Sequence, residues 1–243
     1  QVYQFIGEDN VYFYGPAETA MFLGMQGQSV VSEPLDGALQ VPELVVNKHL
    51  LFLDKKASSS GTVKPPMADE LLEHYAPEQL RAHFLSLGLG QKSISFRPKP
   101  FNPSAGEKDE DPVLKEGNML TNVFNRMART CFYTIQKTTD GRIPVGDVSS
   151  DVLAEAQQSL LNYERSMYRK FFPQAFSGAE KYIRNASKIW NRETQNLDFE
   201  TDGEKLHQLL IDSFHRLRVA CLMLHPFVPQ GCEKIREQMA LDT

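Results

Sequence analysis

The chain has 243 residues, of which 41% are hydrophobic and 23% are charged, a composition typical of a globular protein with one or two domains. Its formal charge of −5 excludes a strongly basic protein that wraps nucleic acid, although a local basic face remains possible. We find no apolar run near the ~18 residues of a membrane span and no signal peptide, so we expect no membrane partner. The cysteines, Cys131, Cys221 and Cys232, form no Cys-x-x-Cys pair. We therefore expect reduced thiols, no metal site and a cytoplasmic protein.

The first part of the chain has short strand-like runs separated by turns. Residues 2–6 predict a strand, residues 7–10 a turn, and residues 11–23 a helix. Further strands are expected at 44–46 and 50–53. A strand followed by an acidic turn and a helix is half of a βαβ unit, in which ligands bind at the carboxyl ends of the strands. Asp9 in this turn suits either a helix cap or a nucleotide ribose contact.

A loop rich in Lys, Ser and Gly is predicted after the third strand, over residues 54–62. Its ammonium, hydroxyl and backbone N–H groups are the donors that hold phosphate oxygens, but the same composition also suits a solvated connector. Two short helices follow at 67–75 and 77–85, the second with Pro77 at its first position. Residues 97–106 and the charged run 107–111 predict an exposed linker.

The second part of the chain has helical periodicity and few helix-breaking residues. Residues 1–112 carry 9 Lys/Arg against 15 Asp/Glu, whereas residues 113–243 carry 17 against 16. Apolar residues at helical spacing predict five helices, at 112–137, 151–172, 176–194, 202–226 and 230–241. Helices joined by short connections favour a bundle.

Two features of the helical part stand out beyond helix packing. Asn125 and Arg129 lie one turn apart and so share a helix face, where they could also cap or bridge neighbouring helices. Trp190 lies within a run of basic residues (Lys181, Arg184, Lys188 and Arg192). Unpaired RNA bases stack on aromatic rings, so Trp190 could be a base platform, although a lone Trp is as readily a core residue. We predict that Asn125, Arg129 and Trp190 converge on one exposed patch.

Three segments in this order resemble the methionyl-tRNA synthetase family. The first, residues 5–14 (FIGEDNVYFY), resembles F-I-G-K-D-x-x-x-F-H. The second, residues 55–62 (KKASSSGT), aligns without a gap with the family's K-M-S-K-S-R-G-T loop. The third is the helix pair at 67–85 with Leu80-Arg81. Glu8, Tyr14 and Ser58 stand where the family has Lys, His and the second loop Lys.

The resemblance implies a role for particular residues. Lys55 and Ser58 occupy the catalytic positions of the loop, and the implied ATP contacts are Gly7, Asp9, Lys55, Lys56 and Ser58. Tyr14 is implied to contact methionine, and Asn125, Arg129 and Trp190 to contact the anticodon. ATP with Mg²⁺ is the implied cosubstrate, with methionine and tRNA(Met) as the other partners.

The resemblance also implies a fold and an activity. We expect an α/β part, residues 1–62, that is the C-terminal half of a Rossmann catalytic domain carrying the signature loop. Connecting helices and a linker follow at 63–111, and an all-α anticodon-binding bundle at 112–243. The activity would be that of a methionine–tRNA ligase. This chain would be a C-terminal part lacking half of the active site, and so inactive alone. Open alternatives are another class I synthetase for an apolar amino acid, a non-catalytic tRNA-binding paralogue, and a helical module without RNA.

Overall fold

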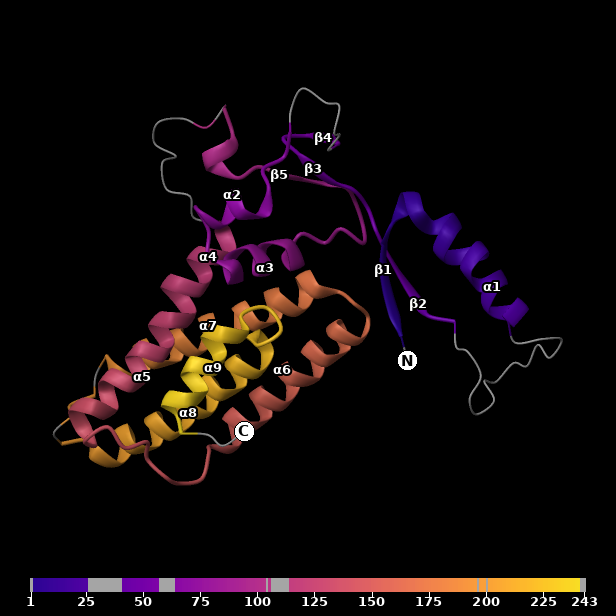
Figure 1. Ribbon diagram of the computed structural model, residues 1–243. Coiled ribbons are helices and arrows are strands. Elements are labelled where there is room, and N and C mark those ends of the chain that lie inside the picture. The colour runs from indigo at the N-terminus through magenta and orange to yellow at the C-terminus, as the bar shows by residue number, and fades with distance from the viewer. Residues whose placement is uncertain are drawn as a thin grey trace. The chain divides into compact units, whose positions relative to one another are not determined.

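The computed structural model describes residues 2–25, 41–56, 64–103, 105, 114–195, 197–199 and 201–240 (Figure 1). These residues belong to a mainly helical chain with two small sheets. They fall into two compact units. The first comprises described residues of 1–67 and 88–105, and the second those of 68–87 and 106–243. Among the described residues, no helix is both long enough and apolar enough to cross a bilayer.

The first sheet of the first unit is a parallel pair of strands. β1 (Tyr3–Gly7) pairs with β2 (Glu43–Asn47), with Phe5 opposite Val45. A 3-10 turn at Glu8–Asn10, a π-helical turn at Phe13–Ala17 and α1 (Glu18–Met25) follow β1. The predicted order of strand, acidic turn and helix is therefore confirmed, and the predicted strand at 44–46 is β2.

The second sheet contains a hairpin that the sequence did not predict. β3 (Leu50–Phe52) lies between β4 (Lys55–Lys56), which is antiparallel to it, and β5 (Ile94–Phe96), which is parallel. The turn residues Leu53 and Asp54 both have positive φ, 47° and 67°, as in a two-residue hairpin turn. The backbone N–H of Asp54 donates to Ser95 Oγ at 2.7 Å. The prediction of a loop from residue 54 was therefore wrong at residues 55 and 56, because pairing with β3 places them in a strand.

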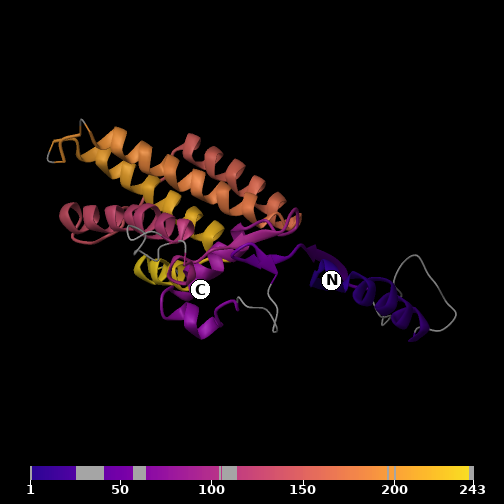
Figure 2. The ribbon, with the colours of Figure 1, turned by 90° about the horizontal axis from the view of Figure 1, so that it is seen from above.

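The second unit is built from helices. Their bounds are α2 (Ala68–Leu72), α3 (Pro77–Ser86), α4 (Lys115–Met119), α5 (Asn125–Thr138), α6 (Ser150–Tyr168), α7 (Phe172–Thr194), α8 (Gly203–Leu224) and α9 (Pro229–Gln238). Figures 1 and 2 show α6, α7 and α8 side by side. α8 is buried along most of its length, and Leu210, Leu217 and Leu224 are fully buried, so this helix forms the centre of the core.

Two helix boundaries differ from the prediction for local reasons. α6 ends at Tyr168 because Lys170 adopts φ 59°, a left-handed conformation that interrupts a helix. α7 then begins at Phe172, four residues earlier than expected, because Pro173 is favoured in the first helical turn, where its missing N–H costs nothing. The helix predicted at 112–137 is present, but a π-helical turn at Leu120–Phe124 separates α4 from α5 directly before Asn125.

Candidate functional site

The turn after β1 is held by two basic residues from the end of β2. Lys48 Nζ donates to Glu8 Oε2 at 2.5 Å, and His49 Nδ1 lies 2.8 Å from Glu8 Oε1. The hydrogen bond from Lys48, together with that of His49, lowers the pKa of the Glu8 carboxyl from its ordinary value. Glu8 therefore works here as an acidic anchor between adjacent strand ends.

The structure places Asp9 and Lys56, two of the predicted ATP contacts, near each other. Lys56 Nζ lies 3.6 Å from Asp9 Oδ2, and His49 Nε2 lies 3.8 Å from the same oxygen. Gly7 makes this arrangement possible, because a Cβ at position 7 would lie 2.6 Å from Asp9 Oδ1. Lys48 and His49 were missed by sequence reasoning, because forty residues separate them from Glu8 and no spacing rule connects the two segments.

Of the remaining residues predicted to contact ATP or methionine, the structure describes Lys55 and Tyr14 but not Ser58. Lys55 lies exposed on β4 next to Lys56. Tyr14 lies in the π-helical turn and is 42% exposed. Ser58 lies outside the described residues, so the structure describes only the first two residues of the predicted signature loop.

Asn125 and Arg129 line an open cavity in the helical unit, which we call the α5–α9 cavity. Its volume is about 570 Å³ and its walls come from α3, α5 and α9. Both side chains are exposed, and Lys234 and Gln238 of α9 line the same cavity. Phe132 and other apolar side chains form part of its wall. Cationic and amide groups beside apolar surface could hold an anionic, planar ligand such as an unpaired nucleotide.

Trp190 lies elsewhere, so the predicted convergence was wrong. It lines a different cavity with Arg126, Thr130 and Cys131, and its ring is half-buried against the helical core. Helical geometry is consistent with the separation, because Arg126 and Thr130 lie about 100° around α5 from Asn125 and Arg129, respectively, and so occupy an adjacent side of the helix.

The basic run of α7 faces away from Trp190 for the same reason. Lys181, Arg184, Lys188 and Arg192 are all exposed and share one helix face. Two of these cations are paired with acids, because Arg184 Nη2 lies 2.7 Å from Glu180 Oε1 and Arg192 Nη2 lies 2.7 Å from Glu193 Oε1. The run is therefore a solvated face with weaker net charge than the four basic residues suggest.

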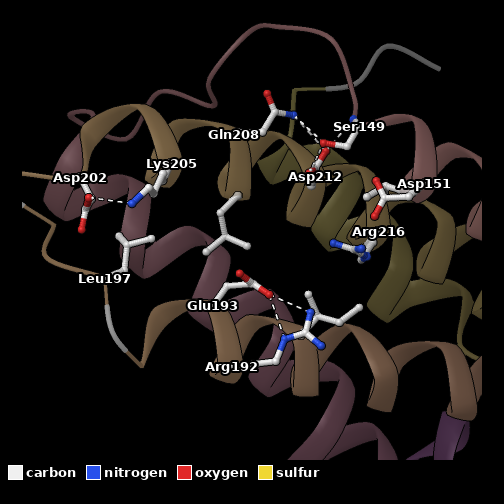
Figure 3. A pocket seen from close by; sticks show the side chains of 13 residues that line it. Ser149, Asp151, Arg192, Glu193, Leu197, Asp202, Lys205, Gln208, Asp212 and Arg216 are labelled. Carbon is white, nitrogen blue, oxygen red and sulfur yellow. Dashed lines mark hydrogen bonds and ion pairs between the residues drawn. The ribbon is translucent and has the colours of Figure 1, made fainter.

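A further cavity of about 670 Å³ lies among α6, α7 and α8 (Figure 3). Asp212 accepts hydrogen bonds from the Ser149 N–H at 2.9 Å and from Ser149 Oγ at 2.7 Å. Arg216, also buried, pairs with Glu155 at 3.3 Å. Lys205 donates to Asp202 at 3.2 Å. Asp212 is held by Ser149, and Arg216 and Lys205 are each paired with a carboxylate, so these contacts join the segments that line the cavity.

No cluster of three or more His, Cys, Asp or Glu side chains that could hold a metal ion occurs in the described parts of the chain. A catalytic or structural metal centre of protein ligands alone is therefore not formed by these residues.

Known proteins similar to this chain are methionyl-tRNA synthetases. No family model matches the chain. The methionine–tRNA ligase of Thermobifida fusca is 23% identical over 243 residues, which covers 98% of this chain and 38% of that protein. That of Mesorhizobium japonicum is 23% identical over 214 residues, covering 85% and 39%.

The fold has similar counterparts among solved structures. Mycobacterium tuberculosis methionyl-tRNA synthetase bound by methionyl-adenylate matches with a TM-score of 0.74 at 20% identity, over 96% of this chain and 43% of that one. Its free form matches with a TM-score of 0.69 at 18% identity. The chain thus spans about two fifths of the length of the relatives it matches. In sequence over nearly its whole length, and in fold, it resembles part of a methionyl-tRNA synthetase.

Proposed function

We propose that this chain is part of a methionine–tRNA ligase, which activates methionine with ATP and transfers it to tRNA(Met). In this proposal the first unit belongs to the nucleotide-binding catalytic domain, and the second unit contains the anticodon-binding bundle together with the connecting helices α2 and α3. The domain bounds would be 1–62, 63–111 and 112–243. The protein would act in the cytoplasm. The observation that carries the proposal is the exposed Asn125–Arg129 pair on an open cavity, in a chain similar to these ligases from end to end.

Two features of the first unit support the proposal that it is half of a Rossmann domain. β1 and β2 are parallel, and parallel strands in α/β proteins are normally covered on both faces. Here Phe5 on β1 is 54% exposed and Tyr12 and Phe13 are exposed beyond the strand end. A two-stranded parallel sheet with this much exposed apolar surface is expected to pack against further layers of a larger α/β domain.

The ATP assignment rests on the groups at the strand ends. Asp9 suits a ribose hydroxyl, and Lys55 and Lys56 on β4 would face the phosphates together with Ser58, with Mg²⁺ carried by the nucleotide. Gly7 keeps the Asp9 carboxylate close to the backbone. Lysines positioned on the phosphates would stabilise charge that develops when the methionine carboxylate attacks the α-phosphate. Tyr14 would contact methionine.

The anticodon assignment rests on the α5–α9 cavity. Asn125 can read a base edge with both a donor and an acceptor, and Arg129 can bind a phosphate or a base edge. Lys234 adds a second cation on the opposite wall. Trp190 as a base platform stays a prediction, and it requires a base to enter the separate cavity beside Arg126.

A binding experiment with the chain tests this proposal. Fluorescence anisotropy would compare labelled tRNA(Met) with the same tRNA carrying a changed anticodon. We expect clear preference for the methionine anticodon. Equal binding of both would contradict the assignment of the α5–α9 cavity, and absence of binding would favour a helical module without RNA.

A second experiment addresses catalysis and the tRNA-binding paralogue, which Ser58 in place of lysine favours. The complete protein would be assayed for methionine-dependent ATP–pyrophosphate exchange. We expect exchange with methionine and much less with leucine or valine. Specific tRNA binding without exchange for any amino acid would identify the paralogue, and exchange with another apolar amino acid would identify a different synthetase.

A further inference from the structure

Two of the three cysteines meet between the last two helices. Cys221 lies in the last turn of α8 and Cys232 in the first turn of α9, and the two helices pack against each other. Both side chains line one cavity of about 440 Å³ between these two packed helices. Both are free thiols in this structure. The third, Cys131, lies in α5 and lines the cavity of Trp190.

The two thiols differ in access. Cys221 is partly exposed, whereas Cys232 is only 2% exposed. The hydrogen bond with Cys221 and the burial of Cys232 both raise the pKa of the Cys232 thiol. An oxidant that enters the cavity therefore meets Cys221 first, while Cys232 stays protonated behind it.

Cations surround the accessible thiol. Arg218 and Arg236 line the same cavity as Cys221. Glu233 partly offsets them, because its carboxylate lies 2.6 Å from Arg236 Nη2 and 2.7 Å from His225 Nε2. Cys221 is therefore a partly exposed thiol in a cavity that also holds basic groups and a second thiol.

We propose that Cys221 and Cys232 are a peroxide-sensitive thiol pair that closes to a disulfide joining α8 to α9. The Cys221 thiolate attacks one oxygen of hydrogen peroxide, the O–O bond breaks, and Cys221 becomes a sulfenic acid as hydroxide leaves. The Cys232 sulfur then attacks the Cys221 sulfur, forming the S–S bond and releasing the second oxygen as water. In total, two thiols are oxidised and one peroxide is reduced to two waters. A dithiol reductant reverses the reaction.

The disulfide would join α8 to α9, a helix that is already bound to α3. Glu78 of α3 accepts the backbone N–H groups of Gln230 and Gly231 at the start of α9, at 2.5 Å and 3.2 Å. The other face of α9 carries Lys234 and Ile235 of the α5–α9 cavity. Oxidation would therefore hold one wall of that cavity to α8.

The test is peroxide treatment of the folded chain, followed by alkylation in denaturant and peptide mass mapping. We expect loss of two alkylatable thiols, a cross-linked peptide pair containing Cys221 and Cys232, and an alkylated Cys131. Reductant should restore all three thiols. A Cys221 sulfonic acid without a cross-link, a cross-link to Cys131, or a disulfide between two molecules would overturn the proposal.

Serine variants distinguish the role of Cys221, which reacts with peroxide, from that of Cys232, which resolves the sulfenic acid. In C232S, the Cys221 sulfenic acid should accumulate and react with a cyclic diketone probe, whereas the unmodified chain should show little labelling. C131S is the matched control, and its disulfide should form as in the unmodified chain. Equal labelling of C232S and the unmodified chain, with circular dichroism showing both folded, would contradict a role for Cys232 in resolving the sulfenic acid.

Discussion

Replacing Arg129 with alanine tests which face of α5 binds RNA. Arg129 is exposed on the α5–α9 cavity, whereas Arg126, three residues earlier in α5, lines the cavity of Trp190. Loss of a guanidinium that contacts RNA directly costs about 1 to 3 kcal/mol, or roughly 5- to 150-fold in Kd. We expect this loss for Arg129→Ala with tRNA(Met).

Arg126→Ala is a matched control because both variants remove one exposed positive charge from neighbouring helix positions. The two arginines lie within about one Debye length, ~8 Å at physiological salt, so their long-range attraction for tRNA is nearly equal. We expect Arg126→Ala to change Kd by less than about 3-fold. The difference between the variants therefore measures direct contact alone.

Fluorescence anisotropy at several salt concentrations provides the measurement. If Arg129 contacts a phosphate of an unpaired loop, the slope of log K against log salt should fall by about 0.7, and if it contacts only a base edge the slope should not change. Equal losses for the two variants would refute direct contact by Arg129. A larger loss for Arg126→Ala would place the RNA on the side of Trp190. Thermal melts should show both variants folded, because exposed substitutions change stability little.

Three further predictions concern the turn after β1 and the contacts of α3. Gly7→Ala should raise the KM for ATP of the complete ligase several-fold because a Cβ would displace the neighbouring carboxylate, whereas Gly24→Ala, where a Cβ meets nothing within 4 Å, should leave KM unchanged. Glu78→Ala should lower the free energy of unfolding in urea by about 1 to 2 kcal/mol, since two N–H groups of α9 lose their acceptor. Burial acts to raise the pKa of Glu116, but the hydrogen bond with His83 at 2.8 Å and other charged and backbone groups lower it overall. The Glu116–His83 pair should therefore stabilise the fold above the ordinary glutamate pKa of about 4.3. This stabilisation should be lost as the pH falls through the lower pKa that Glu116 has in the folded protein. His83→Gln should flatten the pH dependence of the melting temperature.

Local pattern was enough to predict most elements. Apolar residues at helical spacing predicted α5 to α9, and short apolar runs predicted β1 to β3, because each element exposes one face and buries another. The resemblance to methionyl-tRNA synthetases also came from short segments, and the similar proteins and solved structures agree with it. The separation of Trp190 from Asn125 was not predictable in this way, because Trp190 lies on α7 and Asn125 on α5.

Contacts between distant segments were decided only by the tertiary structure. β4 and β5 are too short for a periodic signal, and they exist because both pair with β3. The Glu8 contacts, the Glu78 cap on α9 and the Cys221–Cys232 pair each join segments that no spacing rule relates. Sequence determines which residues can form each element, since that depends on neighbours a few positions away. Which elements meet depends on how their buried faces pack in three dimensions.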